Sequence, residues 1–165
     1  MKSRNKMRKP KLYIETSTWN FYFADDAPEK MDITKNFFRA VEKGSYQIFI
    51  SETVLREIAN APEPKRRMLF DLISKYAPEE LEISEDAIEL VEAYLQHNVV
   101  PDKKRDDAFH VAAATVHEID AIVTWNFKHL ANLRKEELFN AVNLQRGYIR
   151  GIKILTPMEV VTYED

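Results

Sequence analysis

Short β-rich runs alternate with longer helical patterns along this 165-residue chain, and no other feature restricts its fold as strongly. Apolar runs predict four strands, in "KLYIET", "YQIFIS" (Tyr46–Ser51), "AIVTW" (Ala121–Trp125) and "GIKILT" (Gly151–Thr156). Helical spacing of apolar residues recurs between them, in "TKNFFRAVEKG", "ETVLREIANA", "KRRMLFDLISKY", "SEDAIELVEAYLQH" and "RDDAFHVAAATVHE". This alternation predicts an α/β fold with a central, mostly parallel sheet of four to five strands and helices on both faces.

Composition limits the number of domains and the kinds of site. A chain of 165 residues with 45% hydrophobic residues suits a single domain, which we expect over residues 11–165 after a basic tail at residues 1–10. The absence of cysteine excludes disulfides and thiolate metal sites, and the three glycines form no phosphate-binding loop. Because neither a signal peptide nor a membrane-spanning run is recognisable, we expect an intracellular, cytoplasmic protein without membrane association.

Polar side chains follow the predicted strands where ligand sites of parallel sheets form. Glu15 ends the first strand, Asn126 follows the third, Glu57 lies in the helix after the second, and Asp106 and Asp107 open the helix "DDAFHVAAATVHE". Most have a purely structural alternative: Asp106 as a helix N-cap, Glu57 as a solvated helix residue and Asn126 as a turn residue. Glu15 is harder to explain in this way, since a carboxylate ending an inner strand needs a partner or water to offset its desolvation.

The functional hypothesis is that these groups converge as an oxygen-ligand site for Mg²⁺ or Mn²⁺. Carboxylate and amide oxygens suit both ions, which also bind substrate phosphate. Such a site supports hydrolysis of a phosphodiester by activated water, without a side-chain nucleophile.

Four blocks of the sequence resemble the PIN-domain proteins, the fold of VapC-like toxin ribonucleases and related nucleases. They are "YIETSTWN", "SETVLREI", "RDDAFHVAAATVHEIDAIVTWNFKHLAN" and "GYIRGIKILTPMEVV", and they extend from about Lys11 to Val161. The stretch from Asp106 to Leu130 is the most specific, because an acid-led helix, a loop, a strand and "TWN-x-KHL" follow in order.

The resemblance implies a PIN-like three-layer α/β/α fold, Mg²⁺- or Mn²⁺-dependent ribonuclease activity, a partner antitoxin protein and a homodimer. The family's acidic positions fall on Glu15, Glu57, Asp107 and Asn126. The hydroxyl that follows the first acid falls on Ser17, and Asp106 is a neighbour of the third.

Two positions depart from the family's commonest residues. Glu15 replaces Asp, which moves the carboxylate oxygens outward by about 1.5 Å, the length of one C–C bond. Asn126 keeps an oxygen ligand but removes a negative charge. These changes favour a rival hypothesis, a binding module for nucleic acid or protein with a weakened metal site. A metal-dependent phosphatase for small phosphate esters is a third alternative.

Histidine and basic residues border the proposed site. His110 lies one helical turn after Asp106 and Asp107, as an accessory group or a packed helix residue, and His129 contacts phosphate or fixes its loop. We expect cations to bind the phosphates of RNA at Lys103, Lys104, Arg105 and Lys128, with a solvated loop as the alternative.

Aromatic side chains gather just after the first strand, at Trp19, Phe21, Tyr22 and Phe23. They offer a stacking surface for RNA bases. Helix packing or a dimer contact is the favoured interpretation.

Overall fold

One five-stranded sheet, parallel throughout, forms the centre of the protein. In the computed structural model, which describes residues 8–162, the strand order is β3-β2-β1-β4-β5. The strands are β1 (Lys11–Ile14), β2 (Gln47–Ser51), β3 (Glu79–Leu81), β4 (Ala121–Val123) and β5 (Lys153–Leu155). The predicted α/β class and parallel sheet are confirmed. Of the predicted basic tail, residues 1–7 lie outside the described residues, and Arg8 forms an ion pair with Asp120 at 2.7 Å.

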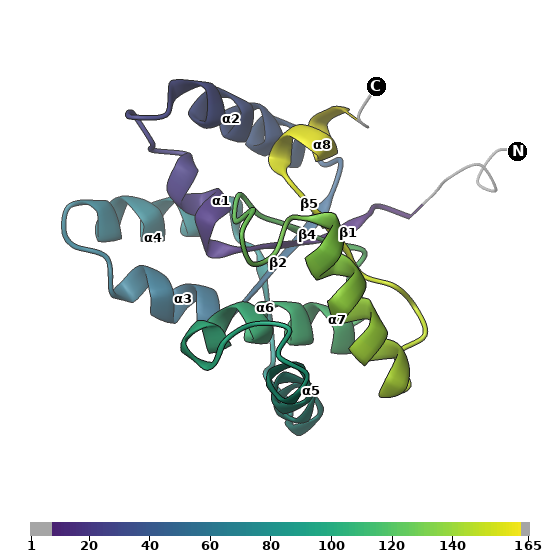
Figure 1. The fold of residues 1–165 in the computed structure, drawn as a ribbon. Coiled ribbons are helices and arrows are strands. Elements are labelled where there is room, and N and C mark those ends of the chain that lie inside the picture. The colour runs from purple at the N-terminus through teal and green to yellow at the C-terminus, as the bar shows by residue number, and fades with distance from the viewer. Residues whose placement is uncertain (1–7, 163–165) are drawn as a thin grey trace, which may run out of the picture.

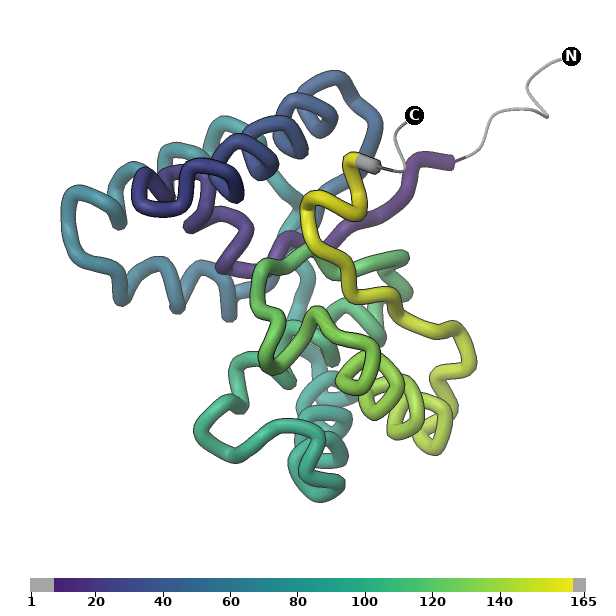
Figure 2. Tube along the Cα trace, turned by 45° about the horizontal axis from the view of Figure 1, so that its top comes forward, coloured from purple at the N-terminus to yellow at the C-terminus, as the bar shows by residue number. Residues whose placement is uncertain are grey.

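Helices cover both faces of the sheet (Figures 1 and 2). On one face α2 contacts α1 and α8, and α1 also contacts α4. On the other face α5 contacts α6 and α7, while α3 bridges the two groups through α4 and α6. The helices are α1 (Thr16–Phe21), α2 (Pro28–Glu42), α3 (Glu52–Ala59), α4 (Lys65–Tyr76), α5 (Glu85–Gln96), α6 (Arg105–Val116), α7 (Leu133–Gln145) and α8 (Pro157–Thr162).

Burial explains why these segments form the core. All residues of β4 are buried, and β1 is buried from Leu12 to Ile14, as expected for strands covered on both faces. Helix α6 is buried around most of its circumference. Its first turn is therefore fixed close to the sheet.

Several helix ends follow from local chemistry. Gly44, at φ +88°, adopts the left-handed conformation just after α2, as its position in the sequence predicts. Ser84 caps α5 by accepting a hydrogen bond from the Ala87 amide. Asp106 is not an N-cap, which corrects the structural alternative: the 3-10 turn Asp102–Lys104 runs into α6, so Lys104 takes the cap position and Asp106 lies in the first turn.

The strand order creates a switch point beside β1. The chain proceeds from β1 to β2 and β3 on one side, then returns through α5 and α6 to place β4 on the other side. Ligand sites of parallel sheets form at such a reversal, outside the carboxyl ends of the strands. Glu15 and Thr124 leave the two neighbouring strands at this point. No helix within residues 8–162 is long and apolar enough to cross a membrane.

Candidate metal centre

Glu15 leaves β1 and serves as the N-cap of α1. Its Oε1 accepts three hydrogen bonds, from the Ser17 amide at 3.0 Å, the Ser17 hydroxyl at 2.5 Å and the Thr124 hydroxyl at 2.6 Å. These donors replace water around a carboxylate that is only 5% exposed. Thus Ser17, which the sequence predicted as an accessory residue, holds the Glu15 side chain in place.

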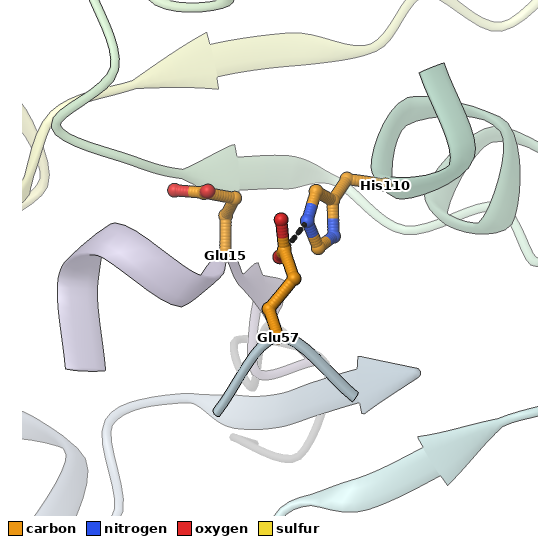
Figure 3. Close-up of side chains that lie close together, drawn as sticks. All are labelled: Glu15, Glu57 and His110. Atoms are coloured by element: carbon orange, nitrogen blue, oxygen red, sulfur yellow. Dashed lines mark hydrogen bonds and ion pairs between the residues drawn. The ribbon is translucent and has the colours of Figure 1, made fainter. Parts of the chain in front are cut away.

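Glu57 projects from α3 toward His110 of α6 (Figure 3). Its Oε1 accepts hydrogen bonds from Thr16 at 2.5 Å and from His110 Nε2 at 2.8 Å. Burial acts to raise the pKa of Glu57, but the hydrogen bond and charge of His110, with help from Thr16 and Arg56, hold the pKa below its ordinary value. Glu57 is therefore a carboxylate at neutral pH, not simply a solvated helix residue.

His110 is fully buried, and both ring nitrogens have partners. Nδ1 lies 2.6 Å from the Tyr13 hydroxyl, which lies 2.8 Å from the Ser51 hydroxyl. Burial acts to lower the pKa of His110, but Glu57, Glu15 and Asp107 raise it above its ordinary value overall. His110 Nε2 donates to the Glu57 carboxylate, and Tyr13 links His110 Nδ1 to the Ser51 hydroxyl. This chain of bonds fixes the Glu57 carboxylate.

Asp107 is the third carboxylate, in the first turn of α6. It is 7% exposed, and its buried Oδ2 has no hydrogen-bond partner among residues 8–162. Burial, together with the negative charges of Glu15 and Glu57, raises the pKa of Asp107 to about 6, although His110 opposes the change. Such an unpaired buried oxygen is costly, which is typical of a position that receives a ligand.

The oxygens of these residues fit a divalent cation. One ligand atom from each of Glu15, Glu57 and His110 lies within 4.8 Å of the other two. Within the described part of the chain, every hydrogen bond to the two glutamates goes to Oε1, so each Oε2 remains available. Carboxylate oxygens of this kind suit Mg²⁺ or Mn²⁺. Asp107 is outside this close group, but the charges of both glutamates act on it. His110 Nε2 is occupied by Glu57 and so acts as a support for that side chain.

Asn126, the fourth predicted ligand, is engaged in its own turn. Its side-chain Oδ1 accepts from the His129 amide at 3.0 Å, and its backbone carbonyl accepts from Leu130 and Ala131. This is the structural role that an asparagine after a strand commonly takes. His129 lies in the same turn, with a buried Nδ1 that has no hydrogen-bond partner among residues 8–162.

The other predicted charged residues fall into two groups, those that form ion pairs and those that are exposed to solvent. Asp106 forms an ion pair with Arg56 at 3.1 Å, and Arg105 binds Glu92 at 2.5 Å, so both are directed into surface contacts. By contrast, the three predicted lysines are exposed. Lys104 lowers the pKa of Asp107, after the larger effects of burial and His110, which shows that its charge reaches the site. Lys103 and Lys128 are likewise exposed.

Four supporting residues were missed by the sequence-based prediction: Tyr13, Thr16, Ser51 and Thr124. Tyr13 shares the face of β1 with Glu15, because side chains alternate along a strand. Ser51 and Thr124 are hydroxyl residues at strand ends, the same signal that singled out Asn126. Their importance depends on contacts between segments far apart in the sequence, which the sequence pattern does not specify.

Comparison with known proteins supports the fold. No protein-family model and no curated protein matches the sequence. Among solved structures, one that matches is the crystal structure of VapBC2 from Rickettsia felis bound to a DNA fragment from their promoter. The alignment covers 88% of this chain and 98% of that one, with 14% identity and a TM-score of 0.53. The similarity establishes a PIN-like fold for the chain.

Proposed function

We propose that this protein is a Mg²⁺- or Mn²⁺-dependent ribonuclease. Two observations carry the proposal: Glu15 and Glu57 converge with their Oε1 atoms already held, and the buried, unpartnered Oδ2 of Asp107 belongs to a carboxyl group on which both glutamate charges act. This arrangement has the charge and the oxygen ligands for a divalent cation, at the switch point of the sheet. The PIN-like fold and the exposed lysines agree with an RNA substrate.

Each residue has a defined task in this proposal. Glu15, Glu57 and Asp107 hold the cation, while Ser17, Thr124 and His110 keep the glutamates oriented. Lys103, Lys104 and Lys128 bind substrate phosphates, since cations beside a site concentrate a polyanion there. The bound cation would activate water and stabilise the oxyanions of the in-line displacement.

Cleavage of mixed-sequence single-stranded RNA in Mn²⁺ tests the proposal. Asp107→Asn keeps the side-chain shape but removes the charge, and we expect the cleavage rate to fall by about 100-fold or more. Asp106→Asn is the matched control, because its neighbouring carboxylate forms only an exposed ion pair. We expect that variant to stay within about fivefold of the unmodified protein. Equal cleavage by Asp107→Asn and the unmodified protein, or no cleavage in either metal, would reject the proposal.

A second candidate is a binding module with a weakened metal site. The occupied Oδ1 of Asn126 favours it, because the fourth family position then supplies no free oxygen. Combining Glu15→Asp with Asn126→Asp separates the candidates. Nuclease activity that arises only in this double variant would identify a degenerate site, whereas activity in the unmodified protein would exclude this candidate.

Partners remain part of the proposal. A homodimer and an antitoxin protein that covers the candidate metal centre follow from the family resemblance, and a chain of the VapBC2 structure shares the fold of this chain. An intracellular location is consistent with an RNA substrate.

A further inference from the structure

Three aromatic rings surround a lysine on the side of the candidate metal centre formed by α1 and α2. Lys30 Nζ lies 5.4 Å from the Phe21 ring centroid, 5.5 Å from that of Trp125 and 5.4 Å from that of Phe127. The Phe21 and Trp125 centroids are 5.9 Å apart, and those of Trp125 and Phe127 are 6.2 Å apart. We call Phe21, Trp125 and Phe127 the aromatic platform.

Within the aromatic platform, Trp125 is buried and held in place, whereas Phe127 is exposed to solvent. Trp125 is 6% exposed, and its indole N–H donates to the Thr34 hydroxyl at 2.9 Å. Phe127 is 49% exposed although Lys30 lies over its ring. A half-exposed phenylalanine held against a fixed tryptophan presents ring surface to solvent at low entropic cost for binding.

Hydrogen bonds connect the platform directly to the metal centre. The Trp125 amide donates to the Ser17 hydroxyl at 2.8 Å, and Ser17 donates to Glu15 Oε1 at 2.5 Å. Phe127 is two residues further along the chain. This connection fixes the turn that carries the exposed ring relative to Glu15.

Positive charge gathers around the same turn. Burial lowers the pKa of His129, and the charges of Lys104, Lys128, Lys135 and Lys103 lower it further, so positive charge acts on this turn. Lys128 directly follows Phe127. Cations that hold phosphates beside an aromatic ring that stacks a base are the usual combination in proteins that bind single strands.

We propose that Phe127, supported by Trp125 and Lys30, is a stacking site for an unpaired base of the RNA substrate. The inference rests on the proposed ribonuclease function and adds a base-binding position to its metal centre. A stacked base within a duplex has no free face for the ring, which excludes intact double helices.

A protein segment is the competing occupant. Phe127 also borders a groove of about 750 Å³ that Leu133, Met158 and β5 line. The charge around His129 favours the base, since a polyanion matches four lysines. Leu133, 74% exposed in the same groove, provides the matched control variant.

Binding measured without metal separates stacking from cleavage. A short fluorescent single-stranded RNA and an abasic strand of the same length are titrated in EDTA, with Phe127→Ala, Phe127→Trp and Leu133→Ala. We expect Phe127→Ala to weaken RNA binding by about 10-fold, Phe127→Trp to restore it, and Leu133→Ala to leave it unchanged. The abasic strand should bind Phe127→Ala and the unmodified protein equally. A 2-aminopurine base in the RNA should be quenched on binding only when residue 127 is aromatic.

Each outcome decides the proposal. Unchanged RNA binding by Phe127→Ala, equal losses in Phe127→Ala and Leu133→Ala, or an equal loss with the abasic strand would overturn it and leave the ring for a protein contact. No RNA binding by the unmodified protein would also overturn it. RNA binding through Phe127 without cleavage in Mn²⁺ would support the stacking site and reject the ribonuclease. Cleavage in Mn²⁺ with no effect of Phe127→Ala on RNA binding would support the ribonuclease and reject the stacking site.

Discussion

Asp107 and Glu15 are both buried acidic side chains, but they differ in the hydrogen-bond donors that the protein provides to them. Glu15 receives three donors, whereas Asp107 Oδ2 receives none from residues 8–162. The Asp107 carboxylate therefore carries an electrostatic cost that the protein does not relieve with its own groups. A cation at this point would relieve it.

Asp107→Asn should stabilise the metal-free protein at high pH. The folded-state pKa of Asp107, about 6, lies above the ordinary value of 3.8 for an aspartate, so ionisation costs stability progressively as pH rises from about 4 to about 6. Removing the charge should raise the free energy of unfolding by about 2 kcal/mol near pH 8 and by almost nothing near pH 4. Urea denaturation in EDTA at both pH values measures this difference.

Asp106→Asn is the control, because its carboxylate is exposed and paired with Arg56. Added Mn²⁺ should stabilise the unmodified protein more than Asp107→Asn, since a ligand that binds only the folded state adds stability. The predicted electrostatic cost of Asp107 would be contradicted if Asp107→Asn were less stable than the unmodified protein at both pH values. A gain in the free energy of unfolding that does not change with pH would also contradict it.

At the scale of elements, α7 closes the outer edge of the sheet. Strand β5 is an edge strand, and unpaired backbone groups at an edge invite association with other chains. Asn140 of α7 donates to the Ile152 carbonyl at 3.0 Å and accepts from its amide at 2.9 Å. Glu136 accepts from the Ile154 amide at 2.8 Å. Side chains thus take the place of a sixth strand.

Asn140→Ala should lower the free energy of unfolding by about 1–3 kcal/mol, because it leaves the backbone groups of Ile152 without partners. Glu137→Ala, an exposed position on the same helix, should change it by less than about 0.5 kcal/mol. Thermal denaturation compares the two variants, and size-exclusion chromatography at rising concentration tests for association at the freed edge. Equal stability of the two variants would show that α7 does not protect β5.

Four elements, β3, α7, α1 and α8, lay beyond sequence-based prediction, for physical reasons. Strand β3 has three residues, of which Glu79 and Glu80 are exposed, so no apolar run marks it. Helix α7 buries only Phe139, Val142 and Asn143 and exposes Leu133 and Leu144, so its apolar pattern is weak. Helices α1 and α8 have six residues each, too few to show a helical period. The remaining strands and helices were recognised because each buries a face with the expected period. The predicted strands were too long at their ends, where Thr124 and Trp125 already leave the sheet.

At the scale of the whole molecule, topology assembles the site. Strand β1 lies between β2 and β4. The carboxyl ends of these three adjacent strands are therefore marked by Glu15, Ser51 and Thr124, and α3, which carries Glu57, begins directly after Ser51. The sequence predicted that the strand ends would carry the acids, because polar residues there interrupt apolar runs. It did not specify which oxygens stay free, since that depends on donors such as Thr16 and Thr124 from other segments.

A crystal soaked in Mn²⁺ tests the central claim most directly, by anomalous scattering from the ion. The account predicts a peak between Glu15 and Asp107, with Glu57 in contact, and no such peak in Asp107→Asn crystals treated in the same way. A soaked crystal without a peak there, or with manganese bound only at other acidic groups, would contradict it.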